Sequence, residues 1–249
     1  MADLVYMTKA TWTAITDAFR NKLGSTEMIK AGDIPSALNS FQKYVDMISD
    51  NVTSVSDENV TLVRSYGFYS CKKLQEVYLP NVTSIGEEAF RSCEMLSKIN
   101  IQNVEMLGSY ALADSYGITE LYLPKAITIG DYAFYEDSQG VSQLKKVTLG
   151  NVKTIGVCAF FNNSNCEEID ISLNENVGSI GASAFYGCEK LSKLIIRGTA
   201  LIELKAMAAL AGTGIALGTG KIYVDPSMVD TYKTATNWSL YASAIEAIS

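Results

Sequence analysis

The segment Leu74-Gln-Glu-Val-Tyr-Leu-Pro-Asn-Val-Thr-Ser-Ile-Gly-Glu-Glu-Ala-Phe-Arg-Ser-Cys93 recurs with variations, about every 22 residues, between residues 52 and 210. Its opening residue recurs at Leu74, Leu96, Ile118, Leu144, Cys166 and Leu191. An apolar-Gly pair follows at Ile85-Gly86, Leu107-Gly108, Ile129-Gly130, Ile155-Gly156 and Ile180-Gly181. Four residues after its first member come Ala89-Phe90, Ala111-Leu112, Ala133-Phe134, Ala159-Phe160 and Ala184-Phe185. Five copies in register predict a solenoid, in which each repeat buries its apolar residues against its neighbours.

The first part of each copy has the alternation of a β-strand. Leu74, Val77 and Leu79 point to one side, whereas Glu76 and Tyr78 point to the other. Stacked repeats would place these strands next to one another. The sequence therefore predicts an α/β solenoid with a curved parallel β-sheet along one side.

The remainder of each copy is predicted to be a bend, a second short extended segment and a short helical turn. Pro80 ends the strand because it has no N–H to donate to a ladder. Gly86 is expected where a side chain would crowd the neighbouring repeat, and residues 87–93 are expected to form the helical turn, with Ala89 and Phe90 inward.

The ends of the chain differ from the repeats and divide it into three parts. Residues 1–50 are expected to form a helical N-terminal cap or attachment segment, 51–211 the solenoid and 212–249 a C-terminal cap. The helical spacing in the first part is that of Trp12, Ile15, Phe19, Leu23, Ile34, Leu38, Phe41, Val45 and Ile48.

Near the C-terminus, the last copy is aligned with Glu203 in the glycine position and Ala206-Met207 in the Ala-Phe position. A flexible link is expected over residues 212–220, a strand over 221–226, and helices over 228–232 and 238–248.

Composition narrows the function classes. The chain has 249 residues, a net charge of −7 and no basic run, which argues against nucleic-acid binding. No apolar stretch approaches 18 residues, so no membrane span is expected, and the N-terminus lacks the pattern of a secretory signal. The five cysteines include no CxxC pair and are expected to be buried thiols rather than a disulfide framework.

Alternating charges occupy one outward column of the predicted first strands. The column is Glu76, Lys98, Glu120, Lys146, Glu168 and Lys193. Because neighbouring strands lie about 4.8 Å apart, each charge would have neighbours of opposite sign. We interpret this charge ladder as structural, since it would disfavour a slip by one repeat. A zwitterionic binding strip is the alternative.

The adjacent outward column is the candidate ligand-binding site. It comprises Tyr78, Asn100, Tyr122, Thr148, Asp170 and Ile195, with Tyr223 as a possible continuation. Aromatic side chains on an open sheet are typical of protein or sugar recognition. The alternative is that tyrosine simply suits a half-exposed strand.

Catalytic, metal and cofactor signals are weak. The chain contains no histidine, which removes the commonest general base and metal ligand. Paired carboxylates such as Glu120 and Glu168 could cleave a glycoside, but lysine neighbours would keep them ionised. Acidic residues near Asp131 lack calcium-loop spacing. We expect no enzyme activity, no cofactor and no metal.

The repeated phrase Leu-x-x-Val-x-Leu-Pro-x-Val-x-x-Ile-Gly-x-x-Ala-Phe-x-x-Cys resembles the BspA-like class of bacterial leucine-rich repeats. The resemblance covers residues 52–249. It implies a non-catalytic adhesion module on the cell surface or secreted, which binds a protein or glycan, possibly host-derived, through the concave strand face.

The first 48 residues depart from that pattern. Residues 14–24 and 34–38 are similar to short helical segments of phage and prophage tail-associated proteins. This similarity implies an alternative: a tail-associated structural component or spacer that self-associates through residues 1–50.

Overall fold

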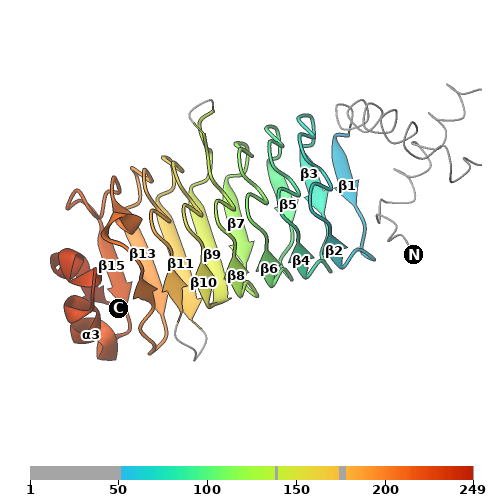
Figure 1. The fold of residues 1–249 in the computed structure, drawn as a ribbon. Helices are drawn as coiled ribbons and strands as arrows, with labels where there is room; N and C mark the ends of the chain where they lie inside the picture. The colour runs from blue at the N-terminus through green and yellow to red at the C-terminus, as the bar shows by residue number, and fades with distance from the viewer. Residues whose placement is uncertain (1–51, 138–139, 174–177, 249) are drawn as a thin grey trace, which may run out of the picture.

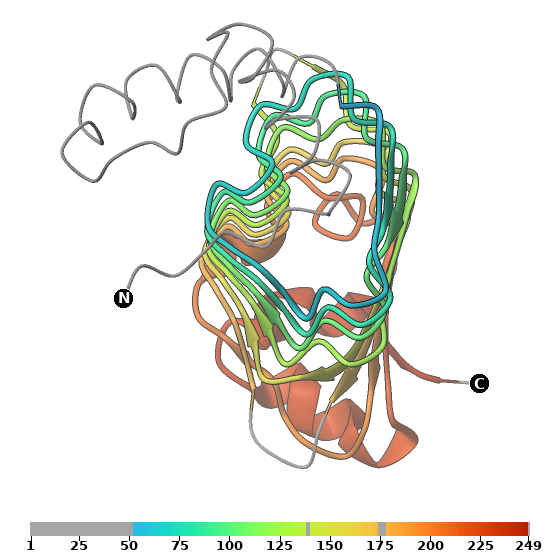
Figure 2. The same ribbon diagram turned by 90° about the vertical axis from the view of Figure 1, so that its right-hand side faces the viewer.

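The computed structural model describes residues 52–137, 140–173 and 178–248, which form one stack of coils (Figure 1). Viewed along the stack, the coils follow nearly the same path from one repeat to the next (Figure 2). The solenoid expected from the repeats is confirmed. The expected helical N-terminal cap and self-association through residues 1–50 lie outside the described residues.

The first strand of each coil pairs in parallel with the first strand of the next. Two sheets result, of three and six strands, because no ladder joins β5 to β7. The single continuous sheet expected from the repeats is therefore interrupted at that point. The three-stranded sheet contains β1 (Ser54–Ser56), β3 (Glu76–Tyr78) and β5 (Lys98–Asn100). The six-stranded sheet contains β7 (Glu120–Leu123), β9 (Lys146–Val152), β11 (Glu168–Leu173), β13 (Lys193–Arg197), β15 (Lys221–Val224) and β16 (Ile245–Ala247).

The second extended segment of each coil forms a parallel sheet of seven two-residue strands. Its strands are β2 (Leu62–Val63), β4 (Ser84–Ile85), β6 (Met106–Leu107), β8 (Thr128–Ile129), β10 (Thr154–Ile155), β12 (Ser179–Ile180) and β14 (Glu203–Leu204). In the clearest copy, Leu74, Leu79 and Phe90 are fully buried and Ile85 nearly so. The core is thus built from the same repeat positions in every coil, as the periodicity predicts.

The glycine of the apolar-Gly pair is required by the close approach of successive coils. A Cβ atom on Gly130 would lie 2.6 Å from the carbonyl carbon of Gly108 and 2.7 Å from the nitrogen of Ser109. Both atoms belong to the backbone and cannot rotate away. Glycine therefore lets these two coils approach each other this closely at Gly130.

The corner expected to be a short helical turn is a succession of tight turns in the well-conforming copies. Glu88 and Ser92 adopt left-handed backbone angles, with φ of 53° and 58°. The N–H groups of Glu88 and Phe90 donate to the carbonyls of Ser109 and Ala111 in the next coil. The corner therefore forms its own inter-repeat hydrogen bonds, which a helix would direct along its own axis.

The alignment of the last copy was wrong by two residues at the glycine position and by three at the Ala-Phe position. Strand β14 pairs Glu203 with Ser179 and Leu204 with Ile180. Lys205 therefore occupies the glycine position. The N–H of Phe185 donates to the carbonyl of Ala209, so Ala209-Leu210 replaces Ala-Phe within the 3-10 helix η2 (Met207–Leu210).

The C-terminal segment continues the solenoid and closes its end. It contains η3 (Pro226–Met228), α3 (Val229–Thr234) and η4 (Trp238–Ala244). The expected strand and first helix are confirmed, but residues 245–247, expected to be helical, form β16. The stretch 212–220, expected to be a flexible link, is hydrogen-bonded to its neighbours and buries Ile215.

Three side chains of the cap form hydrogen bonds to the last repeat. The Trp238 indole donates to Ile202 O at 2.8 Å, and Asn237 Nδ2 donates to Leu204 O at 2.7 Å. Tyr232, which is buried, accepts from the N–H of Ile202 at 3.1 Å. Backbone groups at the end of the stack thereby gain partners that a further repeat would otherwise supply. No helix within the described part of the chain has the length and apolar character needed to cross a membrane.

Candidate functional site

The outward side chains of the first strands, from β1 to β15, form the surface that we call the first-strand face. Its charged column follows the expected register, with Glu76 paired to Lys98 and Glu168 paired to both Lys146 and Lys193. Glu120 pairs in register with Lys146. On each side of the interruption between β5 and β7, equivalent positions of successive repeats therefore lie next to one another, as the repeats predict.

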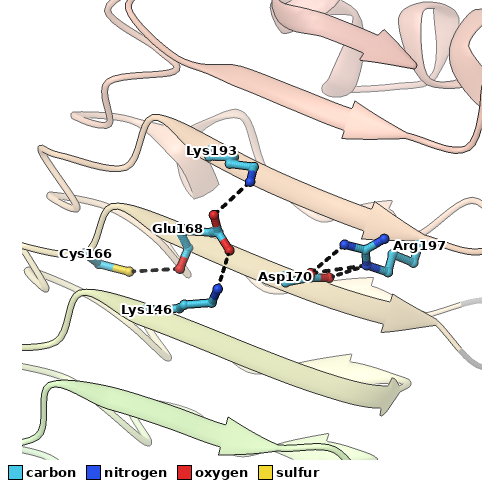
Figure 3. Close-up of polar contacts among 6 residues, drawn as sticks. All are labelled: Lys146, Cys166, Glu168, Asp170, Lys193 and Arg197. Atoms are coloured by element: carbon cyan, nitrogen blue, oxygen red, sulfur yellow. Dashed lines mark hydrogen bonds and ion pairs between the residues drawn. The ribbon is translucent and has the colours of Figure 1, made fainter. Parts of the chain in front are cut away.

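Ion pairs join part of this column. Glu168 accepts from Lys146 and Lys193, each at 2.9 Å (Figure 3). Lys98 pairs with Glu76. The bonds from Lys193 and Lys146 hold the pKa of Glu168 below its usual range, so this carboxylate stays ionised and does not suit general-acid duty.

The alternation of charge fails at the C-terminal end of the column. Lys193 lies in register with Lys221, a residue of the same sign. Lys221 pairs instead with Glu246 on β16. The expectation that every charge has opposite neighbours is therefore wrong for Lys193, because the C-terminal cap adds a strand whose charges follow a different order.

Asp170 forms an ion pair with a residue that belongs to neither of the two predicted columns. Arg197, at the end of β13, donates to both carboxylate oxygens of Asp170, at distances between 2.9 and 3.1 Å (Figure 3). Such a forked pair has more geometric specificity than a lysine contact. Arg197 could have been found by extending the outward alternation two residues beyond Ile195.

The candidate ligand-binding column differs in exposure along the stack. Tyr78 and Tyr122 are 43% and 60% exposed, whereas Asn100, Thr148 and Asp170 are half-buried. A buried oxygen, Asn100 Oδ1, has no hydrogen-bond partner among the described residues. The accessible part of the column is therefore its tyrosines.

Ile195 is not accessible. It was placed on the binding column, but it is only 5% exposed. In the strand register it lies between Asp170 and Tyr223, and the arginine that clamps Asp170 extends from the same strand. Because Ile195 has neighbours on both adjacent strands, its side chain is covered and cannot contact a ligand.

A second aromatic surface lies at the corner turns and was missed. We call it the corner aromatic band: Tyr66, Tyr69, Tyr110, Tyr132, Tyr135, Phe161 and Tyr186. Tyr110 stacks on Tyr132 with ring centroids 4.6 Å apart, and Phe161 stacks on Tyr186 at 5.0 Å. Aligning the copies at the third and sixth residues after the apolar-Gly isoleucine would have found this band.

Much of the corner band is occupied by its own contacts. Stacked rings cover one another's faces, and the Arg91 guanidinium lies 5.0 Å from the Tyr110 ring centroid. Arg91 also pairs with Glu88 at 3.1 Å. We interpret the stacked part as a stabilising ladder of rings between coils.

Three carboxylates gather where the repeat beginning at Ile118 is lengthened: Asp114, Glu136 and Asp137. Asp137 accepts from the Tyr116 hydroxyl at 2.7 Å. Burial, reinforced by the other two carboxylates, raises the pKa of Glu136 to about 9, so it is protonated at neutral pH. Within the described ranges, no group of three or more His, Cys, Asp or Glu residues is placed to hold a metal ion.

The buried cysteines make hydrogen bonds in an interior column, rather than acting only as small apolar residues. Cys93 Sγ donates to Phe68 O and Cys188 Sγ to Phe160 O, each at 3.1 Å. Ser115 takes the same position and donates to Phe90 O at 3.0 Å. Burial raises the pKa of Cys93 and Cys188, so these thiols remain protonated and unsuited to nucleophilic chemistry.

The family follows from comparison of the repeats with known families. Residues 17–141 and 128–209 match the model of the BspA type leucine rich repeat region, in 6 copies. The chain belongs to the BspA-type leucine-rich repeat family. Its match begins well before residue 52, where the repeats become recognisable by eye.

Solved structures similar to this BspA-type chain are leucine-rich repeat proteins. A leucine rich cell surface protein from Faecalibacterium prausnitzii is 28% identical, with a TM-score of 0.49, and the match covers 58% of this chain and 38% of that one. A Treponema pallidum leucine rich repeat protein is 20% identical (TM-score 0.41; 56% and 78% covered). One from Bacteroides ovatus is 18% identical (TM-score 0.28; 71% and 64% covered).

The chain thus spans 38% of the length of the Faecalibacterium protein. No match was found among curated proteins. The similarity of the N-terminal residues to phage tail proteins has no support from these comparisons, and those residues lie outside the described ranges.

Proposed function

We propose that this BspA-type chain is a non-catalytic binding module, located at a bacterial cell surface, that recognises a protein or a glycan through the first-strand face. The observation that carries the proposal is the exposure of Tyr78 and Tyr122, 43% and 60%, at equivalent outward positions of the first-strand face. Exposed tyrosines offer large contact area with a hydroxyl at the tip, and they lose little entropy on binding.

Several features favour binding over catalysis. The pKa of Glu168 is lowered rather than raised, and the buried thiols are protonated. Glu136, whose pKa is raised to about 9, is 4% exposed and cannot reach a substrate. The membership of a leucine-rich repeat family supports a role in interaction.

The test is capture of proteins and glycans from a defined host-surface panel. The double variant Tyr78→Ser/Tyr122→Ser should lose capture with little change in thermal midpoint, because both side chains are exposed and lie outside the core. The matched control is Tyr66→Ser/Tyr69→Ser, which removes two tyrosines of similar exposure, 53% and 43%, from the corner aromatic band.

Two outcomes would contradict the proposal. Loss of capture only in the control pair would place recognition on the corner. Unchanged capture in both pairs would favour the alternative of a spacer that assembles through residues 1–50. That alternative predicts assembly in size-exclusion chromatography that disappears when these residues are removed.

A further inference from the structure

The charge column of the first-strand face is paired unevenly. Glu168 forms ion pairs with two lysines, Lys146 and Lys193, and Glu76 forms one with Lys98. Within the part of the chain that the structure describes, Glu120 forms no ion pair, although Lys146 is its register neighbour. Lys146 extends the other way, to Glu168. Among the described residues, Glu120 is thus the one glutamate of the column that is exposed and forms no ion pair.

The most exposed aromatic side chain of this face is the immediate neighbour of that carboxylate. Tyr122 follows Glu120 by two residues on β7, so both side chains point outward from the same strand. It is 60% exposed, more than any other tyrosine of the described chain. An unpaired carboxylate and an open aromatic ring therefore stand side by side.

The same strand, β7, is the edge of the six-stranded sheet. No ladder bonds join it to β5, and the half-buried Asn100 across this interruption keeps a side-chain oxygen without a partner. In this part of the face, Glu120 and Asn100 therefore have polar atoms without a partner within the described residues. On the other side of β9, by contrast, Glu168 and Asp170 are fully engaged by Lys146, Lys193 and Arg197.

An arginine side chain fits this pair of groups. A guanidinium offers a planar fork that matches a carboxylate and also stacks on an aromatic ring, whereas an ammonium does so less well. The protein contains both halves of this arrangement elsewhere. On the same face, Arg197 donates to both carboxylate oxygens of Asp170. At the corner, Arg91 lies over the ring of Tyr110.

We propose that Glu120 and Tyr122 form an arginine-binding subsite, and that the partner of the first-strand face is a protein segment that presents an exposed arginine. This deepens the proposed function and rests on it. The attraction is local to β7, because the other charges of the column are already paired within the protein. An uncharged glycan would gain nothing from Glu120.

The test uses a small probe and the full chain. N-acetyl-arginine methylamide is titrated against the labelled protein, and backbone amide shifts of residues 120–123 are followed by NMR. Its uncharged isostere, N-acetyl-citrulline methylamide, is the matched probe. We expect saturable shifts at β7 with the arginine probe and none with citrulline.

Glu120→Gln should weaken arginine binding by up to about fivefold, because a solvent-exposed charge pair is lost. Glu76→Gln, which removes a glutamate already paired with Lys98, should leave it unchanged. Equal shifts with both probes, or binding that Glu120→Gln does not weaken, would overturn the subsite.

The two proposals fail separately. If panel capture depends on Tyr78 and Tyr122 while the arginine probe does not bind, the first-strand face remains the binding surface and the arginine subsite is wrong. If the arginine probe binds but the tyrosine variants retain all capture, the function proposed for the face is wrong.

Discussion

Lys146 pairs with Glu168 at 2.9 Å, although the strand register also places it beside Glu120. Among the described residues, Lys146 forms its ion pair with Glu168 and none with Glu120. The alternating column therefore fixes the order of the strands without pairing every charge. Each exposed pair contributes only about 0.2–1 kcal/mol, so the column contributes more to register than to stability.

The variant Glu168→Gln should lower the free energy of unfolding by about 0.4–2 kcal/mol, because the ion pairs with Lys146 and Lys193 are both lost. The lowered pKa of Glu168 means that its contribution is present above its ordinary pKa of 4.5 and is lost as pH falls through the lower, folded-state value. Urea unfolding of variant and wild type should therefore converge in acid. A difference that persists unchanged at pH 2 would contradict this account.

Gly130→Ala should destabilise the protein by more than about 3 kcal/mol, because the new Cβ would meet the backbone of the preceding coil. Gly218→Ala is the control. Gly218 has φ of +80° but nothing within 4 Å of an added Cβ, so only the left-handed backbone opposes the change, at about 1 kcal/mol. Equal urea midpoints for the two variants would show that the coils are not stacked this closely.

Cys188→Ala should cost about 1–3 kcal/mol, because Phe160 O would lose its donor while buried. Cys188→Ser should cost less. Ser115 already makes the equivalent bond to Phe90 O in another coil, so a hydroxyl fits this column. The thermal midpoints of the two variants test whether the hydrogen bond of the thiol contributes to stability. An alanine variant as stable as the serine variant would mean that the thiol only fills apolar space.

Glu136→Gln should flatten the pH dependence of stability. Between pH 4.5 and about 9 the folded protein keeps the Glu136 proton, whereas the unfolded chain releases it. Stability should therefore fall as pH rises through this window, by at most about 1.4 kcal/mol per pH unit. The exposed Glu105 supplies the control, Glu105→Gln. Parallel wild-type and Glu136→Gln stability curves across the window would refute a protonated Glu136.

The repeat made most of the fold predictable, because each position recurs with the same environment. The phrase around Leu74 and Ile85 located strands, core and the crowded glycine. It failed where the period changes. The last copy is two residues longer between its strands, so alignment on Ile202 misplaced Glu203 and Ala206, and only the hydrogen-bonded register shows the shift.

The candidate site was harder to predict than the fold. The columns of outward residues followed from alternation, but their exposure did not, since Ile195 is only 5% exposed although it occupies an outward position. Arg197 and the corner aromatic band were missed because they lie outside the two columns considered. The left-handed corner, with a non-glycine residue such as Tyr132 at φ of 57°, has no signal in composition.

The most direct test of the account is hydroxyl-radical footprinting of the protein in complex with a partner captured from the panel. Tyrosine oxidation is compared between the free and bound states. The account predicts that Tyr78 and Tyr122 become protected, while Tyr66 and Tyr69 of the corner aromatic band are oxidised as in the free protein. Protection of Tyr66 and Tyr69, with Tyr78 and Tyr122 unchanged, would contradict recognition by the first-strand face.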